Sequence, residues 1–249
     1  MLELRGLSIG YGEKTVLHNV SLSLAHGTFT AIVGPNGCGK STLFKTLLGI
    51  LPPLVGTVLL DGAPITSMKR SEIARRVSYL SQAKGLPNMT VSELVLHGRF
   101  PHLPPFARYG ERDRAIARSA MEKMGLLTHA DTLLSHLSGG ECQRAYVAMA
   151  LAQETDVLLL DEPTSSLDVR HAQMLLKALK ALALEGKTVA VVTHDLPLAF
   201  RLADRVAVLD KSGLLAFDTP GHACVLDAVK KAFGVSLAYS DDAGYFYCY

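Results

Sequence analysis

Short apolar runs, separated by glycine-rich turns and amphipathic stretches, dominate the hydrophobic pattern of the chain. Loose alternation over residues 2–9 predicts a strand, and two more β-rich runs follow at 20–24 and 28–33. Later runs are short and almost wholly apolar, which is typical of strands buried on both faces of a parallel sheet. These runs are 77–80, 157–160, 188–192 and 205–209, with helical stretches such as 172–184 between them. The pattern predicts an α/β fold with a β-rich start.

Residues 86–153 differ from the rest because they hold helical patterns and no convincing strand. Thr90 and Glu93 have the spacing of a capping box, which predicts a helix running toward Arg99. A proline-rich break over 102–110 precedes a second helical stretch, 111–124, which stops at Gly125. We therefore expect one domain over 1–249, in which 1–85 and 154–249 form the core with a β subdomain and 86–153 a helical subdomain.

Composition and charge narrow the class of protein. The chain has 249 residues, 49% hydrophobic and 19% charged, with a formal net charge of +2, so composition excludes disorder and disfavours nucleic acid as the main partner. It has no apolar run of membrane-spanning length, and its first residues read as a strand rather than a secretory signal, which predicts a cytoplasmic protein. The four cysteines form no metal-type pair and are expected to be free thiols.

A glycine-rich loop follows the apolar strand 28–33 and precedes a helical run. Gly34, Gly39, Lys40 and Ser41 match the phosphate-loop pattern, in which backbone amides and a helix N-terminus face phosphate oxygens. Lys40 would reach the β- and γ-phosphates, and the Ser41 hydroxyl would bind Mg²⁺. The alternative is an ordinary glycine turn, which the strand–loop–helix context disfavours.

Two adjacent carboxylates, Asp161 and Glu162, end the buried strand 157–160. The alternation of a strand sends them in different directions, so they can take separate roles. Asp161 would hold Mg²⁺ through its water shell, while Glu162 would orient and deprotonate the water that attacks the γ-phosphate. The alternative for this segment alone is a solvated strand end.

The segment 137–141 reads Leu-Ser-Gly-Gly-Glu and opens a further helix. Ser138 and Glu141 have capping-box spacing, which alone would account for the segment. Two glycines in a first turn nevertheless weaken a helix, each by about 1 kcal/mol relative to alanine in an interior position. We expect the backbone there to approach a ligand, and the γ-phosphate on a second copy of the protein suits the exposed amides.

In combination and order, these motifs resemble the ATP-binding cassette (ABC) family over essentially the whole chain. The resemblance implies a P-loop NTPase core with a mixed, mainly parallel sheet, an N-terminal antiparallel β subdomain and a helical subdomain that carries the signature 137–141. It implies ATP and Mg²⁺ as cofactors. It also implies that Gln82 senses Mg²⁺ and the attacking water, that 165–168 is a dimer-contacting loop, and that His194 touches the γ-phosphate.

The site residues implied by the resemblance fall into three groups. Those that act in hydrolysis are Lys40, Gln82, Glu162 and His194. Those that hold Mg²⁺ are Ser41, Gln82 and Asp161. Those that bind the nucleotide are Tyr11, which stacks on adenine, then Gly34, Pro35, Asn36, Gly37, Cys38, Gly39, Lys40, Ser41 and Thr42, and, from the second copy, Ser138, Gly139, Gly140 and Glu141.

The family resemblance also implies partners. Two copies close head to tail as a homodimer with ATP between them, and the chain works with two separate permease subunits at the cytoplasmic face of the membrane. The segments 88–95, 98–101, 109–113 and 138–153 are similar to cassettes of importers for ferric siderophores, haem and cobalamin. Such importers use an extracytoplasmic binding protein, and residues 83–110 would contact the permease. The alternatives are an importer of another ligand, such as a metal ion, or a soluble ABC ATPase.

Two of the cysteines lie in these motifs. Cys38 is in the phosphate loop and Cys142 follows the signature, so we expect them to approach each other across the dimer. On this interpretation thiol reagents inhibit the protein, and ATP protects Cys38.

Overall fold

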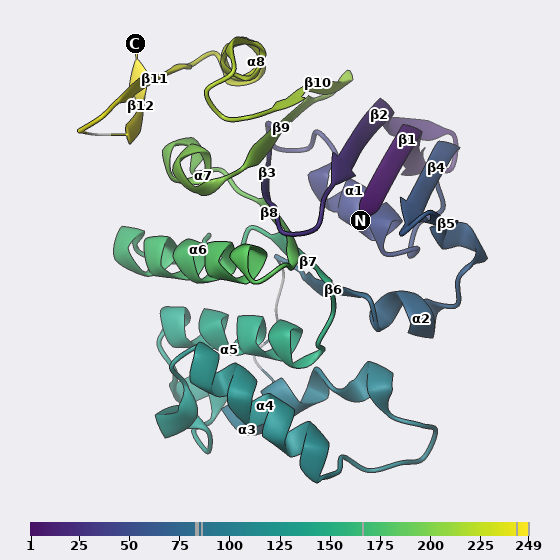
Figure 1. The fold of residues 1–249 in the computed structure, drawn as a ribbon, viewed down its shortest axis with the longest axis vertical. Helices are drawn as coiled ribbons and strands as arrows, with labels where there is room; N and C mark the ends of the chain where they lie inside the picture. The colour runs from purple at the N-terminus through teal and green to yellow at the C-terminus, as the bar shows by residue number, and fades with distance from the viewer. Residues whose placement is uncertain (83–84, 86, 166, 243, 249) are drawn as a thin grey trace.

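A six-stranded sheet runs through the molecule, in a computed structural model that describes residues 1–82, 85, 87–165, 167–242 and 244–248 (Figure 1). Its strand order is β10-β9-β3-β8-β7-β6, and every neighbouring pair is parallel except β10 with β9. The bounds are β3 Phe29–Val33, β6 Val77–Leu80, β7 Val157–Asp161, β8 Thr188–Val192, β9 Arg205–Asp210 and β10 Gly213–Asp218. The apolar runs thus predicted the parallel strands to within a residue or two.

A second sheet, with strand order β2-β1-β4-β5, is antiparallel and confirms the predicted N-terminal β subdomain. Its strands are β1 Leu2–Tyr11, β2 Lys14–Leu24, β4 Val55–Leu60 and β5 Ala63–Pro64. The helix α1, Lys40–Leu47, buries Leu43, Phe44 and Leu47 in one apolar cluster with residues from both sheets. The first turn of α1 is therefore fixed by the core on which it packs.

Helices cover the rest of the six-stranded sheet. The helix α6, Val169–Leu184, shares an apolar cluster with sheet residues and with α3 Val91–His97, α4 Glu111–Lys123 and α5 Gly139–Ala152 (Figure 1). The helix α7, Leu196–Leu202, and α8, Ala223–Phe233, pack with β9 and β10 in a third cluster. The remaining helical elements are α2 Arg70–Ala74, η1 Ile65–Ser67, η2 Phe100–His102, η3 Leu127–His129 and η4 Leu134–His136.

The predicted helical region contains α3, α4 and α5, and its described residues form no strand, only a single bridge between Thr90 and Leu133. The Thr90 hydroxyl accepts a hydrogen bond from the Glu93 amide, as the capping box predicts. The helix α3 ends at His97, short of Arg99, and α4 ends one residue before the predicted Met124, with Gly125 left-handed at φ 65°. The subdomain limits at 85/86 and 153/154 stay a prediction.

The C-terminal segment forms a hairpin of β11 Ser236–Ser240 and β12 Gly244–Cys248, which the sequence analysis did not predict. The Tyr245 ring packs edge-on against Phe200 of α7, with centroids 5.4 Å apart, and contacts Tyr239. These rings hold the hairpin against α7. No helix formed by the described residues is long and apolar enough to cross a membrane.

Candidate functional site

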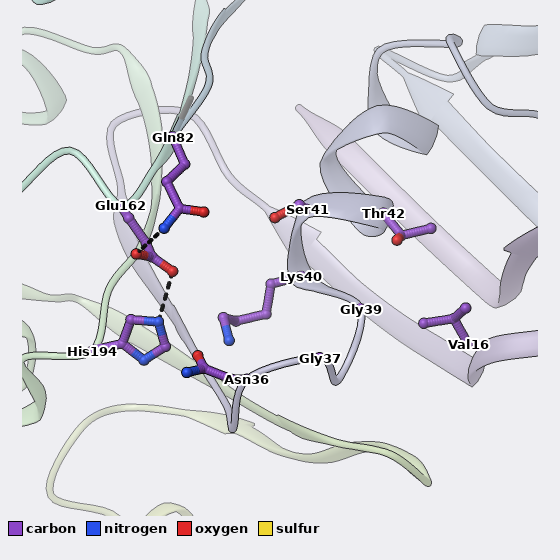
Figure 2. A pocket seen from close by; sticks show the side chains of 10 residues that line it. All are labelled: Val16, Asn36, Gly37, Gly39, Lys40, Ser41, Thr42, Gln82, Glu162 and His194. Carbon is purple, nitrogen blue, oxygen red and sulfur yellow. Dashed lines mark hydrogen bonds and ion pairs between the residues drawn. The ribbon is translucent and has the colours of Figure 1, made fainter. Parts of the chain in front are cut away.

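A cavity of about 480 Å³ opens at the carboxyl edge of the parallel strands (Figure 2). The loop after β3 forms one wall, and single residues that follow β6, β7 and β8 form the other: Gln82, Glu162 and His194. In open α/β sheets ligands bind at this edge. Residues more than 150 positions apart in the sequence, from Asn36 to His194, thus meet in one site.

Two glycines shape the phosphate loop. A Cβ at Gly34 would lie 2.5 Å from the Leu209 carbonyl oxygen, so the loop can pass β9 only without a side chain there. Gly39 has φ 105° and would bring a Cβ to 2.7 Å from Val16 of β2. This left-handed turn leads directly into α1. The glycines of the motif are therefore required by geometry before any ligand is considered.

Lys40, the first residue of α1, is 6% exposed and turns back over the loop. Its Nζ donates to the carbonyl oxygens of Gly34, at 2.7 Å, and Pro35, at 3.0 Å. Its ammonium group lies in the cavity lining with Asn36 and Ser41 (Figure 2). A buried cation at a helix N-terminus gives this wall the positive character that a phosphate needs.

Glu162 is held by two partners from neighbouring strands. Gln82 Nε2 donates to Glu162 Oε2 at 2.6 Å, and His194 Nε2 lies 2.7 Å from Glu162 Oε1 (Figure 2). The Glu162 backbone has φ 50°, a left-handed conformation that costs energy for a non-glycine residue, while its amide donates to Val192 O. This conformation directs the carboxylate, 15% exposed, into the cavity and opposite the loop.

Asp161 is buried, at 2% exposed, and unlike Glu162 it does not line the cavity. Tyr79 donates to its Oδ2 at 3.4 Å, and burial, with the nearby Asp161 charge, raises the pKa of Tyr79 so that it stays a donor. Its Oδ1 finds no hydrogen-bond partner among the described residues. A buried carboxylate oxygen without a partner suits a cation or its water shell. Ser41 and Gln82 line the cavity and Asp161 does not, so the predicted Mg²⁺ site formed by these three residues stays a prediction.

Tyr11 ends β1 and is 50% exposed. Hydrogen bonding with the Thr42 side chain lowers the pKa of the Tyr11 hydroxyl. Tyr11 is not among the described residues that line the cavity, so its stacking role stays a prediction.

The signature 137–141 forms the predicted cap of α5. Ser138 Oγ accepts the Glu141 amide, and the hydrogen bond from Ser138 lowers the pKa of the Glu141 carboxyl. A Cβ at Gly140 would meet only His171 and Leu167, at 3.5 Å or more, which is ordinary contact. Packing within the chain therefore does not require glycine at 140. No signature residue lines the cavity that holds Lys40 and Glu162, as far as the described residues show.

The predicted dimer-contacting loop lies beside the same carboxylate. Ser165 and Leu167 line a neighbouring hollow with Glu162 and His194, and Asp168 caps α6 by accepting the His171 amide at 2.8 Å. Ser166 lies outside the described residues. Its predicted role is therefore untested.

Val16 is a lining residue that the sequence analysis missed. It lies on β2, and its place in the site follows from the packing of Gly39 against that strand. The predicted β-rich runs, 2–9 and 20–24, do not include it, and a single apolar residue between them gives no local sign of this role. Only the complete fold brings it to the loop.

The prediction of a reactive Cys38 was wrong. The side chain is 1% exposed and belongs to the apolar cluster under the loop, and burial raises the pKa of the thiol. The loop glycines turn the backbone toward the cavity and leave this side chain in the core. Cys38 can contribute its backbone amide to a nucleotide, but its thiol is shielded by the core.

Labelling of the native protein tests this correction. We expect a brief exposure to iodoacetamide to modify the exposed Cys224 and to leave Cys38 unmodified, regardless of ATP, because the Cys38 thiol is buried and poorly ionised. Peptide mass spectrometry after digestion measures both sites. Rapid modification of Cys38 in the folded protein would contradict the observed burial.

Comparison with known proteins matches these features to one family. The family model described as "ABC transporter" matches residues 17–165, which run from β2 past the Asp161–Glu162 pair. The chain belongs to the ABC transporter family. This membership confirms the predicted fold and identifies the chain as an ATP-binding cassette, an ATPase coupled to transport.

Several relatives match along almost their full length. The chain is 42% identical over 96% of its length to the ferric enterobactin transport ATP-binding protein FepC of Escherichia coli K12, and covers 90% of it. It is 39% identical over 95% of its length to the iron(3+)-hydroxamate import ATP-binding protein FhuC of Bacillus subtilis, and covers 88% of it.

Solved structures agree. A metal-chelate type ABC transporter in an inward-facing conformation gives a TM-score of 0.85 at 27% identity, covering 100% of this chain and 97% of that chain. The dimeric cassette MJ0796, bound to ADP and Pi after hydrolysis, gives a TM-score of 0.76 at 29% identity. The match covers 89% of this chain and 100% of that chain.

Proposed function

We propose that the chain is the ATP-hydrolysing subunit of an importer that takes up an iron chelate of the ferric siderophore type. One observation carries the hydrolytic part: Glu162 is held by Gln82 and His194 opposite the Lys40 loop, in one cavity. The cargo rests on full-length similarity, because the ferric enterobactin and iron-hydroxamate cassettes are 42% and 39% identical to this chain.

The geometry supports a division of labour in hydrolysis. The amides of the phosphate loop and the Lys40 ammonium bind the phosphates, while Glu162 takes a proton from the attacking water. His194 and Gln82 fix both carboxylate oxygens and so hold the base in place. Ser41, Asp161 and Gln82 would hold Mg²⁺, which neutralises phosphate charge and orients the phosphate oxygens when bound.

A homodimer with ATP between its two copies completes the site. The signature residues Ser138, Gly139, Gly140 and Glu141 expose a helix N-terminus that does not line the cavity of their own chain, as far as the described residues go. A second copy, turned head to tail, would bring that N-terminus to the phosphates. The dimeric MJ0796 cassette supports this arrangement.

Contacts with two permease subunits are proposed for 83–110, and an extracytoplasmic protein would supply the chelate. Within the described part of this region, Phe100 is 71% exposed and Phe106 is fully exposed on a proline-rich connection. Exposed aromatic side chains of this size favour a protein interface. Residues 83, 84 and 86 lie outside the described part of the chain. The complex would lie at the cytoplasmic face of the membrane.

An importer for a metal ion is the second candidate. The manganese transport ATP-binding protein MntB of Listeria innocua is 35% identical to the chain over 84% of its length. Haem and cobalamin remain further candidate cargoes, and a soluble ABC ATPase is the alternative without transport. All of them would share the nucleotide site, so the cargo must be tested separately.

Uptake measurements test the proposal. Cells that lack the gene and express the cognate permease receive the native chain, Lys40→Ala or the control Lys211→Ala, which removes an exposed cation from the β9–β10 turn. We expect Lys40→Ala alone to abolish uptake of labelled ferric siderophore, because the phosphates lose their charged partner, while haem, cobalamin and Mn²⁺ uptake is unchanged. Selective loss of another cargo would overturn the siderophore proposal, and loss of none would overturn import.

A further inference from the structure

The strand β10 leads into the segment before the helix α8 (Figure 1). Three side chains of different ligand types meet there, and none of them lines the nucleotide cavity. Asp218 is the last residue of β10, His222 caps α8, and Cys224 lies in its first turn. One ligand atom from each lies within 4.8 Å of the other two. The part of the chain that the structure describes holds no other such group of three.

The separations are close to those around a metal ion. His222 Nδ1 lies 3.1 Å from Cys224 Sγ, and His222 Nε2 lies 3.9 Å from Asp218 Oδ2. Tetrahedral zinc, with bonds of about 2.0–2.3 Å to nitrogen, oxygen and sulfur, places its ligand atoms about 3.3–3.6 Å apart. The two distances involve different nitrogens of the His222 ring, and only one of them would bind the metal. The side chains must therefore rotate slightly to bring all three ligand atoms to one ion. His222 and Cys224 are exposed, which leaves both side chains free to rotate.

The carboxylate is already oriented for this role. Asp218 Oδ1 accepts hydrogen bonds from Arg205, at 2.7 Å, and from the Thr219 amide, at 2.8 Å. These bonds fix the carboxylate and leave Oδ2 on the side of His222. Carboxylates that bind metals are commonly held by such outer hydrogen bonds.

We propose that Asp218, His222 and Cys224 form a binding site for a divalent transition metal of the Zn²⁺ class, with water as the fourth ligand. A carboxylate and a thiolate together neutralise the charge of the ion. The mixed oxygen, nitrogen and sulfur set suits Zn²⁺ or Co²⁺ and disfavours Mg²⁺ and Ca²⁺, which take oxygen ligands.

Ligation would connect two elements of the C-terminal part. Asp218 belongs to β10, while His222 and Cys224 belong to α8, which packs with β10 and the hairpin in one apolar cluster. The alternative is that His222 serves only as a helix cap, since its Nδ1 accepts the Cys224 amide at 3.3 Å. A helix cap needs neither the Cys224 thiol nor the Asp218 carboxylate, whereas the metal site needs both. Substitution of Cys224 therefore distinguishes the two interpretations.

Cobalt absorption tests the site. The purified full-length chain, stripped of metal and without nucleotide, is titrated with Co²⁺, which gives a thiolate-to-metal charge-transfer band in the near ultraviolet only when sulfur binds. We expect one Co²⁺ per chain, displaced by Zn²⁺. The Cys224→Ser variant should lose the band. His222→Ala should weaken binding by more than the roughly 10–100-fold that loss of an outer-shell partner costs.

Cys248→Ser is the matched control, since Cys248 lies in the hairpin strand β12 and offers a thiol outside the cluster. It should keep the band, and circular dichroism should confirm that every variant is folded. Absence of the band from the native chain overturns the proposal. Persistence of the band in Cys224→Ser, or its loss in Cys248→Ser, also overturns it. Oxygen ligands at the phosphate loop give no thiolate band, so the result does not depend on the proposed import function.

Discussion

Replacement of Glu162 by glutamine is expected to slow ATP hydrolysis by about 10²- to 10⁴-fold, the usual contribution of a general base, and to leave ATP binding intact. The amide has the shape of the carboxylate but cannot take a proton from water. Glu162 is the only carboxylate among the described residues that line the cavity, so no second acid there can replace it. Phosphate release measures turnover, and fluorescent-nucleotide titration measures binding.

The same variant separates hydrolysis from dimer closure. If ATP lies between two copies, a chain that binds but does not hydrolyse ATP should accumulate as a dimer in size-exclusion chromatography with ATP and Mg²⁺. Glu185→Gln is the control, because Glu185 is 56% exposed and pairs with Lys123 at the surface. Full hydrolysis by Glu162→Gln would remove Glu162 from the role of base, and a monomer with bound ATP would contradict the shared site.

Burial explains which parts of the fold the sequence could predict. The strands β7, β8 and β9 are buried along most of their length, so each contains an unbroken run of four apolar residues. The strand β4 starts with two exposed residues, and the C-terminal hairpin is only partly buried, so neither has a run of that kind. The hairpin depends on ring contacts of Tyr245 with Phe200, which no local pattern contains.

The sequence predicted part of the candidate site, and the features that it missed depend on contacts between distant segments. Asp161 and Glu162 lie in different surroundings, as predicted, one beside Tyr79 and one in the cavity. The alternation of a strand is not the reason, because β7 ends at Asp161. The left-handed backbone of Glu162 was not predictable, because it depends on the Val192 carbonyl of the next strand. Cys38 was misplaced because a motif gives the path of the backbone and not the direction of each side chain.

Arg99 provides the test of how the helical region is held together. Its side chain is 5% exposed and bridges three segments: Nε donates to Asp113 Oδ1 at 3.1 Å, and one terminal nitrogen donates to Ala152 O and Glu154 Oε2 at 2.7 and 2.9 Å. It thus connects the residues after α3 to the start of α4 and the end of α5. Its loss would leave one carbonyl oxygen and two carboxylates without their cation.

Arg99→Ala is expected to lower the free energy of unfolding by about 2–4 kcal/mol, somewhat less than a fully buried pair, because Glu154 is 46% exposed. Urea denaturation measures the change, and Arg118→Ala, at an exposed position of α4, is the control that should change stability by less than about 0.5 kcal/mol. Equal midpoints for the two variants would show that the Arg99 contacts do not stabilise the fold.

The pH dependence of Arg99→Ala separates its charge from its packing. The pKa of Asp113 is lowered first by the Gly110 amide and then by Arg99, so the native chain gains stability from this carboxylate above its unfolded pKa and loses it as pH falls through the lower folded pKa. Without Arg99 the folded pKa rises toward the unfolded value but stays below it, since the Gly110 amide remains. The gap between native and variant stability should therefore narrow below about pH 4, where Asp113 is protonated in the unfolded chain. A gap that stays constant down to low pH would assign the effect of Arg99 to packing alone.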